Sequence, residues 1–165
     1  MRTHRIATVV GAAVAAVALA ASPAAAGSAH FIGNLTTASA SGADLTVQFK
    51  EAGLESGSVE TVQVTAHLDA TYQCINNGGH NPDDPKKTTI SADVSKSGQF
   101  TAGKNGNING SLTVSAPAAA TVLDCPNGQT ATLTVVTWSN ISIADLTSGA
   151  FLAIPGTFTS GSPVN

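Results

Sequence analysis

The chain has 165 residues, of which only 10% are charged, and its formal net charge is −3. Two of its basic residues, Arg2 and Arg5, lie at the extreme N-terminus, and the rest of the chain holds five lysines, no arginine and a formal charge of −5. A protein without a basic surface lacks the Lys and Arg side chains that neutralise phosphates, so nucleic acid is excluded as a partner. The same shortage excludes an electrostatic anchor to anionic lipid.

The N-terminal segment has the pattern of a secretory signal peptide. Two positive charges precede an uncharged apolar run over residues 6–21, and a stretch of small residues follows. Cleavage after Ala26 is favoured, which makes residues 1–26 the signal peptide. Cleavage after Ala29 is the alternative, and it places His30 at the mature N-terminus. Because the apolar run is shorter than the roughly 20 residues that span a bilayer, we expect a secreted, extracellular protein without a membrane anchor.

The remaining chain, residues 27–165, is expected to form a single domain built from strands. Gly, Ser, Thr, Ala and Val dominate its composition, and these residues favour strands and turns over helices. Residues 31–39 are a weak strand candidate. Residues 45–49 alternate cleanly between apolar and polar side chains, which predicts a strand with one buried face.

The longest alternating segment runs from Val62 to Cys74. Apolar or aromatic residues occupy every second position, and only a pleated strand places such residues on one face. The opposite parity puts His67 on the solvent face. Because a segment of this length is longer than most strands, we expect a bulge or a bend partway along it.

Short strands and turns alternate after a polar loop at residues 76–85. The predicted strands are 88–94, 99–101 and 108–114, the predicted turns are 97–98 and 103–107, and residues 116–120 form a connector with a possible short helical turn.

Residues 130–144 carry apolar side chains on both parities, with Trp138 on the minority parity. This pattern predicts either a register shift near Thr137 or a strand covered on both sides. A core position for Trp138, near the disulfide, is favoured over an exposed platform for a sugar ring. Residues 150–158 are interrupted by Pro155 and are expected to form an edge strand.

These elements predict an all-β protein. About eight short strands with frequent turns and no amphipathic helix favour an antiparallel immunoglobulin-like β-sandwich, and a small closed β-barrel is the alternative.

The two cysteines, Cys74 and Cys125, are predicted to form one disulfide, because the chain is expected to reach an oxidising compartment. Each cysteine is predicted to mark the end of a strand beside a turn-rich loop. Closing a loop of about 52 residues removes around 4 kcal/mol of chain entropy from the unfolded state in the loop-closure model. The sequence has no Cys-x-x-Cys spacing, so the bridge is interpreted as structural.

The binding candidate in the sequence is the loop after Cys74, with residues Asn77, His80, Asn81, Asp83 and Asp84. Its side-chain oxygens are suitable ligands for calcium. The same Asn, Asp, Gly and Pro residues are also what an ordinary long turn uses, and that interpretation is preferred. No signature of a serine hydrolase, a zinc protease or a nucleotide-binding loop is present, so no catalytic residue is assigned.

Copper is the alternative cofactor. If His30 is the mature N-terminus, its amine and imidazole can bind copper together, with His67 or His80 completing the site. This arrangement resembles that of lytic polysaccharide monooxygenases and some exported copper carriers of sandwich fold. The resemblance implies a copper-binding protein or a copper-dependent oxidative enzyme as the alternative function.

Several stretches resemble small exported proteins of filamentous actinobacteria. They are Ala29-His30-Phe31, Phe49–Leu54, the motif Tyr72-x-Cys74-x-Asn-Asn-Gly-Gly, Asn81-Pro82 and Lys86-Lys87. The resemblance covers most of the mature chain and implies export and a one-domain size, with no catalytic residue to transfer. The sequence therefore predicts a secreted, disulfide-bonded module that binds an extracellular protein or a cell-wall polysaccharide, or that forms a structural part of the cell exterior.

Overall fold

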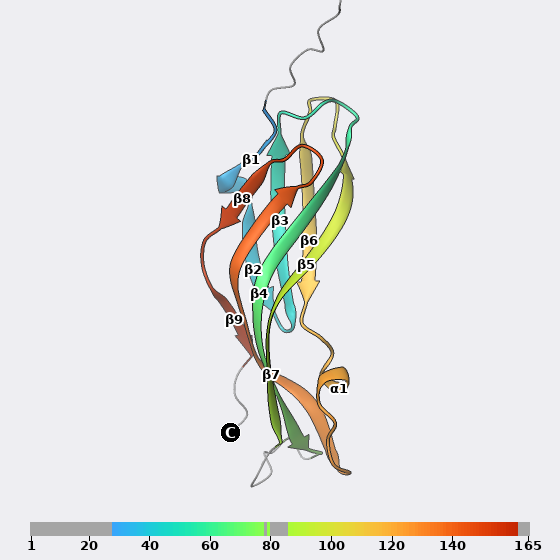
Figure 1. Cartoon of the computed structure of the whole chain (residues 1–165), viewed down its shortest axis with the longest axis vertical. Helices are drawn as coiled ribbons and strands as arrows, with labels where there is room; N and C mark the ends of the chain where they lie inside the picture. The colour runs from blue at the N-terminus through green and yellow to red at the C-terminus, as the bar shows by residue number, and fades with distance from the viewer. Residues whose placement is uncertain (1–27, 78, 80–85, 162–165) are drawn as a thin grey trace, which may run out of the picture.

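Alternating apolar residues build two antiparallel sheets that pack face to face (Figure 1). The computed structural model describes residues 28–77, 79 and 86–161. The two sheets share no hydrogen-bonded strand pair among these residues, so the fold is the predicted sandwich and not the closed barrel that was the alternative. No helix in the described part of the chain is long and apolar enough to cross a membrane.

The first sheet is centred on β3. One side of β3 pairs with two short strands in line, and the other side pairs with β6. The predicted strand at residues 31–39 is therefore broken in two, because a 3-10 turn, η1, interrupts it. The elements of this sheet are β1 (His30–Phe31), η1 (Gly33–Leu35), β2 (Thr37–Ser41), β3 (Asp44–Ala52) and β6 (Ile108–Ser115).

The second sheet has the order β5, β4, β7, and then β8 and β9 along the outer side of β7. The strand that follows β4 in the chain, β5, pairs with β4 and not with the first sheet, which distinguishes the topology from a constant-type immunoglobulin domain. The strands are β4 (Val59–Asn76), β5 (Lys87–Thr101), β7 (Gln129–Asp145), β8 (Phe151–Ile154) and β9 (Phe158–Gly161). The predicted edge strand at residues 150–158 is thus split at Pro155-Gly156 into two edge pieces.

The predicted irregularity of the long strand is confirmed. The register between β4 and β7 shifts between Thr65 and His67 and again between Thr71 and Tyr72. Opposite the first shift, β7 carries Asn140 at a positive φ of 49°. This bulge reverses the inward parity of β7, so the predicted shift exists but lies a few residues beyond Thr137.

The inward side chains of both sheets form one core. Trp138 and Tyr72 are its largest fully buried side chains, so the predicted core position of Trp138 is confirmed. The ring of Phe49 packs edge-to-face against Phe31 at 5.8 Å and Phe100 at 5.1 Å between ring centroids.

The turn predicted at residues 97–98 is wrong, because β5 runs unbroken from Lys87 to Thr101. Gly98 lies inside the strand and is explained by packing: a Cβ atom there would come within 3.0 Å of the Leu112 side chain and 3.2 Å of the Phe100 ring. A glycine can therefore mark a place in a strand where neighbouring side chains approach the backbone closely, and not only a turn.

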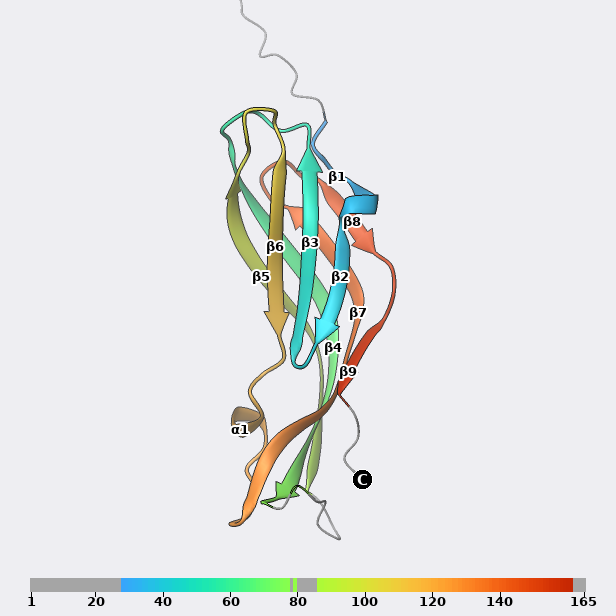
Figure 2. The ribbon, with the colours of Figure 1, turned by 180° about the vertical axis from the view of Figure 1, so that it is seen from behind.

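The second sheet extends beyond the first at one end of the molecule (Figures 1 and 2). At that end the chain between β6 and β7, with the short helix α1 (Ala119–Val122), packs against β7 and replaces the first sheet as a cover. Tyr72 donates a hydrogen bond from Oη to the Pro117 carbonyl at 2.8 Å.

The predicted disulfide between Cys74 and Cys125 is present at this end, with Cα atoms 5.7 Å apart. The prediction that each cysteine marks a strand end is wrong for Cys125. It lies in the irregular segment between α1 and β7, because this segment is a cover and not a strand of either sheet.

Candidate functional sites

The predicted binding loop is described only in part. Asn77 is exposed, and its backbone N–H donates to the Gly128 carbonyl at 3.3 Å, which joins two turns at the disulfide end. His80, Asn81, Asp83 and Asp84 lie outside the described residues. The calcium hypothesis for this loop stays a prediction.

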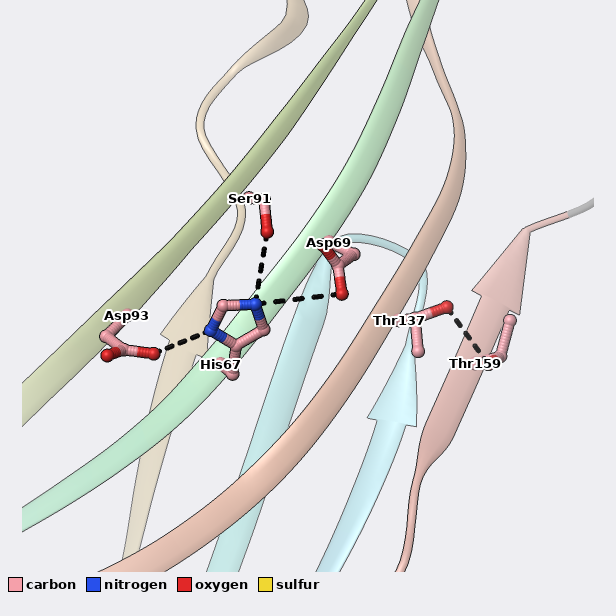
Figure 3. A network of polar contacts seen from close by, with 6 residues as sticks. All are labelled: His67, Asp69, Ser91, Asp93, Thr137 and Thr159. Atoms are coloured by element: carbon pink, nitrogen blue, oxygen red, sulfur yellow. Dashed lines mark hydrogen bonds and ion pairs between the residues drawn. The ribbon is translucent and has the colours of Figure 1, made fainter.

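His67 is the centre of a polar network on the outer face of the second sheet (Figure 3). Its Nδ1 lies 2.7 Å from Asp93 Oδ1 and its Nε2 lies 3.1 Å from Ser91 Oγ, both on β5. The carboxylate of Asp69 is 3.8 Å from Nε2. The prediction that His67 faces outward is confirmed. The hydrogen bond that the His67 ring donates to the Asp93 carboxylate raises the pKa of His67 above the ordinary histidine value, while burial acts in the opposite direction.

The order Ser91, His67, Asp93 matches the connectivity of a serine-hydrolase triad, in which one ring nitrogen holds the acid and the other contacts the hydroxyl. The acid of such a triad is buried, whereas the Asp93 side chain is 78% exposed. A solvated carboxylate on a flat sheet face does little to hold an imidazole ready for catalysis. The network is therefore best interpreted as a polar clamp that joins β4 to β5.

The two described histidines of the copper hypothesis are not brought together. His30 begins β1 in the first sheet, where its Nδ1 lies 2.8 Å from the Ser28 carbonyl. His67 points away from that sheet. No group of three or more His, Cys, Asp or Glu residues within residues 28–77, 79 and 86–161 is arranged to hold a metal ion.

Three buried acids, which the sequence interpretation missed, meet at the end of the sandwich opposite the disulfide. Glu51 on β3, Glu60 on β4 and Asp145 on β7 are 0%, 4% and 1% exposed. A sequence signal existed, because each acid continues the inward parity of its strand: Glu51 follows Val47 and Phe49, for example. No salt bridge to a basic side chain neutralises any of them among the described residues.

Glu51, Glu60 and Asp145 form an acid cluster in which protonation of a carboxyl group, and not a basic side chain, reduces the buried negative charge. Burial raises the pKa of Glu51 to about 7, and the charge of Asp145 and a hydrogen bond with it add to the effect. Burial works against ionisation of Asp145 as well, but hydrogen bonds from Ser148 and from the backbone N–H of Thr147, at 2.8 Å, lower its pKa. Glu51 and Asp145 thus form a carboxyl–carboxylate pair that links the two sheets.

The acid cluster opens toward a surface depression of about 380 Å³ whose lining includes Glu60, Ser58, Thr147 and Ser148. Ser58 donates to Glu60, and Ser148 donates to Glu51 at 3.3 Å. Because the carboxyl groups themselves are buried, the cluster is suited to binding protons and coupling the two sheets.

The outer edge of β5 is the third feature. β5 has fifteen residues in unbroken register with β4, contains no proline and pairs with no other strand in the described part of the chain. Its upper part lies beside β6, where Gly98 meets Leu112, but its lower part runs past the end of the first sheet (Figures 1 and 2). We call the outer backbone edge of residues 87–95 the open edge.

The hydrogen-bond phase of β5, meaning which of its alternate residues bond to β4, shows which residues face the open edge. The backbone N–H of Cys74 donates to the Lys86 carbonyl at 3.0 Å just before β5, and the backbone N–H of Ala102 donates to the Ser58 carbonyl at 2.9 Å just after it. In an antiparallel ladder without a bulge, the residues that bond to the neighbouring strand alternate. Even-numbered residues of β5 therefore bond to β4. The backbone N–H and C=O groups of the odd-numbered residues Lys87, Thr89, Ser91, Asp93 and Ser95 point to the open edge.

No protein-family model matches the chain, and no curated protein matches it in sequence. Among solved structures, the solution structure of R. palustris CsgH aligns with 81% of this chain and 91% of that chain, with a TM-score of 0.23 and 10% sequence identity. A similarity of this size carries no argument about fold or function.

Proposed function

We propose that this protein is a secreted, non-catalytic interaction module of the cell exterior, and that it binds its partner by adding a strand to the open edge. A disulfide is consistent with an oxidising, extracellular location. The observation that carries the proposal is the row of backbone donors and acceptors along residues 87–95, for which the described residues provide no strand partner.

A sheet edge with unpaired backbone groups is a template for another chain, and proteins usually protect such edges by shortening, bending, charge or proline. The other described edge of the second sheet is broken by Pro155-Gly156, and the β1–β2 edge of the first sheet is broken by η1. β5 has none of these interruptions and carries only three charged residues, Lys87, Asp93 and Lys96. Strand addition is a common way to bind an extended segment through such an edge.

The side chains beside the open edge define the partner's chemistry. Odd-numbered residues such as Thr89 and Ser91 lie on the polar outer face, and Ile90 and Val94 lie on the inner face. A partner strand with one polar and one apolar face matches this pattern, because opposite residues share a face. This favours a protein partner over a polysaccharide.

The test compares the wild-type protein with T89P and Q99P. Proline at 89 removes a backbone donor that points to the open edge and leaves the ladder to β4 intact. Q99P removes a donor of the same phase beside β6 and is the matched control. Each protein is used to capture partners from the culture fluid and cell-wall fraction, and the captured complex is examined by amide hydrogen exchange.

We expect wild type and Q99P to capture the same partner, T89P to lose it, and the amides of Thr89, Ser91 and Asp93 to gain protection in the complex. Capture that survives T89P, or protection confined to another surface, would contradict the proposal.

A further inference from the structure

We propose that the strand on the open edge is β5 of a second copy of this chain, so that the second sheets of two copies join into one continuous sheet. The inference rests on the proposed function, because it names the partner of the same edge. It is carried by the hydrogen-bond phase of β5 and by the positions of its charges.

The phase restricts the register. Two antiparallel copies of β5 form hydrogen bonds across the open edge only when odd-numbered residues lie opposite odd-numbered residues. The two-fold axis must then lie midway between the two copies of one residue of β5, which is opposite itself. An axis at Asp93 would place two aspartates opposite each other, which is unfavourable.

An axis at Ile90 gives the charge-matched register. It places Lys87 opposite Asp93 of the second copy, and the symmetry repeats this pair. Both residues belong to the odd-numbered set, so their side chains share the outer face. An exposed pair of this kind contributes little free energy, but charge matching selects one register over its alternatives.

The same register gives hydrogen-bond partners to the backbone N–H and C=O groups at the open edge. Lys87, Thr89, Ser91 and Asp93 would exchange about eight hydrogen bonds with their counterparts, since each opposed pair of this phase exchanges two. Ile90 would lie opposite Ile90 of the second copy at a close, non-hydrogen-bonded position. Its half-buried side chain, already packed against the core, would be covered further.

His67 supports this arrangement from within each copy. Its 2.7 Å hydrogen bond holds the Asp93 carboxylate on the outer face. The Asp93 side chain remains 78% exposed, so its second oxygen is accessible to a lysine from another copy.

Self-association is measured by analytical ultracentrifugation on the oxidised mature protein. We expect a dimer, at least tenfold weaker dimerisation for K87D, and recovery in K87D/D93K, because the exchanged charges again lie opposite each other. K104D makes the same charge change in the turn after β5 and is the matched control. A dimer that resists both K87D and T89P would refute the assignment of this surface.

A cysteine substitution tests the register itself. I90C should form a disulfide between two copies, since residues at the two-fold axis lie within disulfide range, and S97C should not. Equal cross-linking of the two variants would refute the register.

Failure of this inference can be distinguished from failure of the proposed function. A wild-type protein that stays monomeric to about 1 mM overturns self-pairing. The proposed function stands in that case if capture of another protein is still lost in T89P, and both fall if T89P changes neither measurement.

Discussion

The His67 imidazole and the Asp93 carboxylate are joined across β4 and β5 by a 2.7 Å hydrogen bond, which ties the acid of the edge strand to the centre of the sheet. This hydrogen bond is the main reason that the pKa of His67 is raised, and the more distant Asp69 adds to it. The protonation of His67 is therefore coupled to the position of the Asp93 side chain beside the open edge.

NMR titration of the His67 ring should give a pKa above 6.5 in the wild-type protein. We expect D93N to lower it strongly, because the hydrogen bond to an ionised partner is lost. D69N should lower it less, since Asp69 is 3.8 Å away and acts through its charge. Equal effects of the two variants would show that the hydrogen bond is not the main cause.

The acid cluster predicts that stability falls as pH rises. The pKa of Glu51 is about 7 in the folded protein and 4.5 without its environment, so the folded state binds the proton more tightly. This contribution is complete below about pH 4.5 and is lost as pH rises through 7, and the full shift corresponds to about 3 kcal/mol. Asp145, whose pKa is lowered, has the opposite effect and destabilises the protein only in strong acid.

Denaturant melts between about pH 5 and pH 8 should therefore show a declining free energy of unfolding for wild type. E51Q should flatten this decline, because glutamine keeps a hydrogen-bond donor toward Asp145 without a titrating proton. The exposed Glu55 provides the matched control, and E55Q should retain the wild-type profile. A decline that persists unchanged in E51Q would assign the pH dependence to other groups.

Removing the disulfide should lower the free energy of unfolding by around 4 kcal/mol, because the bridge closes a long loop of the unfolded chain. The variant is C74A/C125A, and wild type with the disulfide reduced provides an independent comparison. The measurement is chemical denaturation, in which the midpoint and the dependence of the unfolding free energy on denaturant concentration are compared for each protein. A loss below about 1 kcal/mol would mean that the cover formed by residues 116–125 is held mainly by packing.

Gly110 is predicted to be intolerant of any side chain. A Cβ atom there would lie 2.5 Å from the Phe49 ring and 2.8 Å from the Phe100 ring, inside the contact between the sheets. G110A should destabilise the protein by about 1–3 kcal/mol through overpacking. G33A is the control, since nothing lies within 4 Å of the new atom, and it should change stability by less than about 0.5 kcal/mol. Equal melting temperatures for the two variants would contradict the packing argument.

Alternation in the sequence was sufficient to predict the sandwich, because inward parity is a local property. It placed Leu45 and Tyr72 in the core, and both are buried. The same rule points Glu51, Glu60 and Asp145 inward, because each lies at an inward position near the end of its strand.

Other features depend on pairing between distant strands and have no local signal. The splitting of residues 31–39 depends on pairing with β3, and the unbroken path of β5 through Gly98 depends on pairing with β4. The open edge is of the same kind, because its existence depends on which strand lies outermost in the second sheet. The loop after Cys74 carries a local signal for binding only because turn residues and ligand residues are chemically alike.

Amide hydrogen exchange along β5 tests the central claim most directly. In dilute solution the amides of Thr89, Ser91 and Asp93 should exchange quickly, while those of Ile90 and Ala92, which bond to β4, should be protected. Raising the protein concentration should protect the three odd-numbered amides and leave the even-numbered ones unchanged. If the odd-numbered amides exchange quickly at every concentration and in the presence of every captured partner, the open edge binds no strand and the account is wrong.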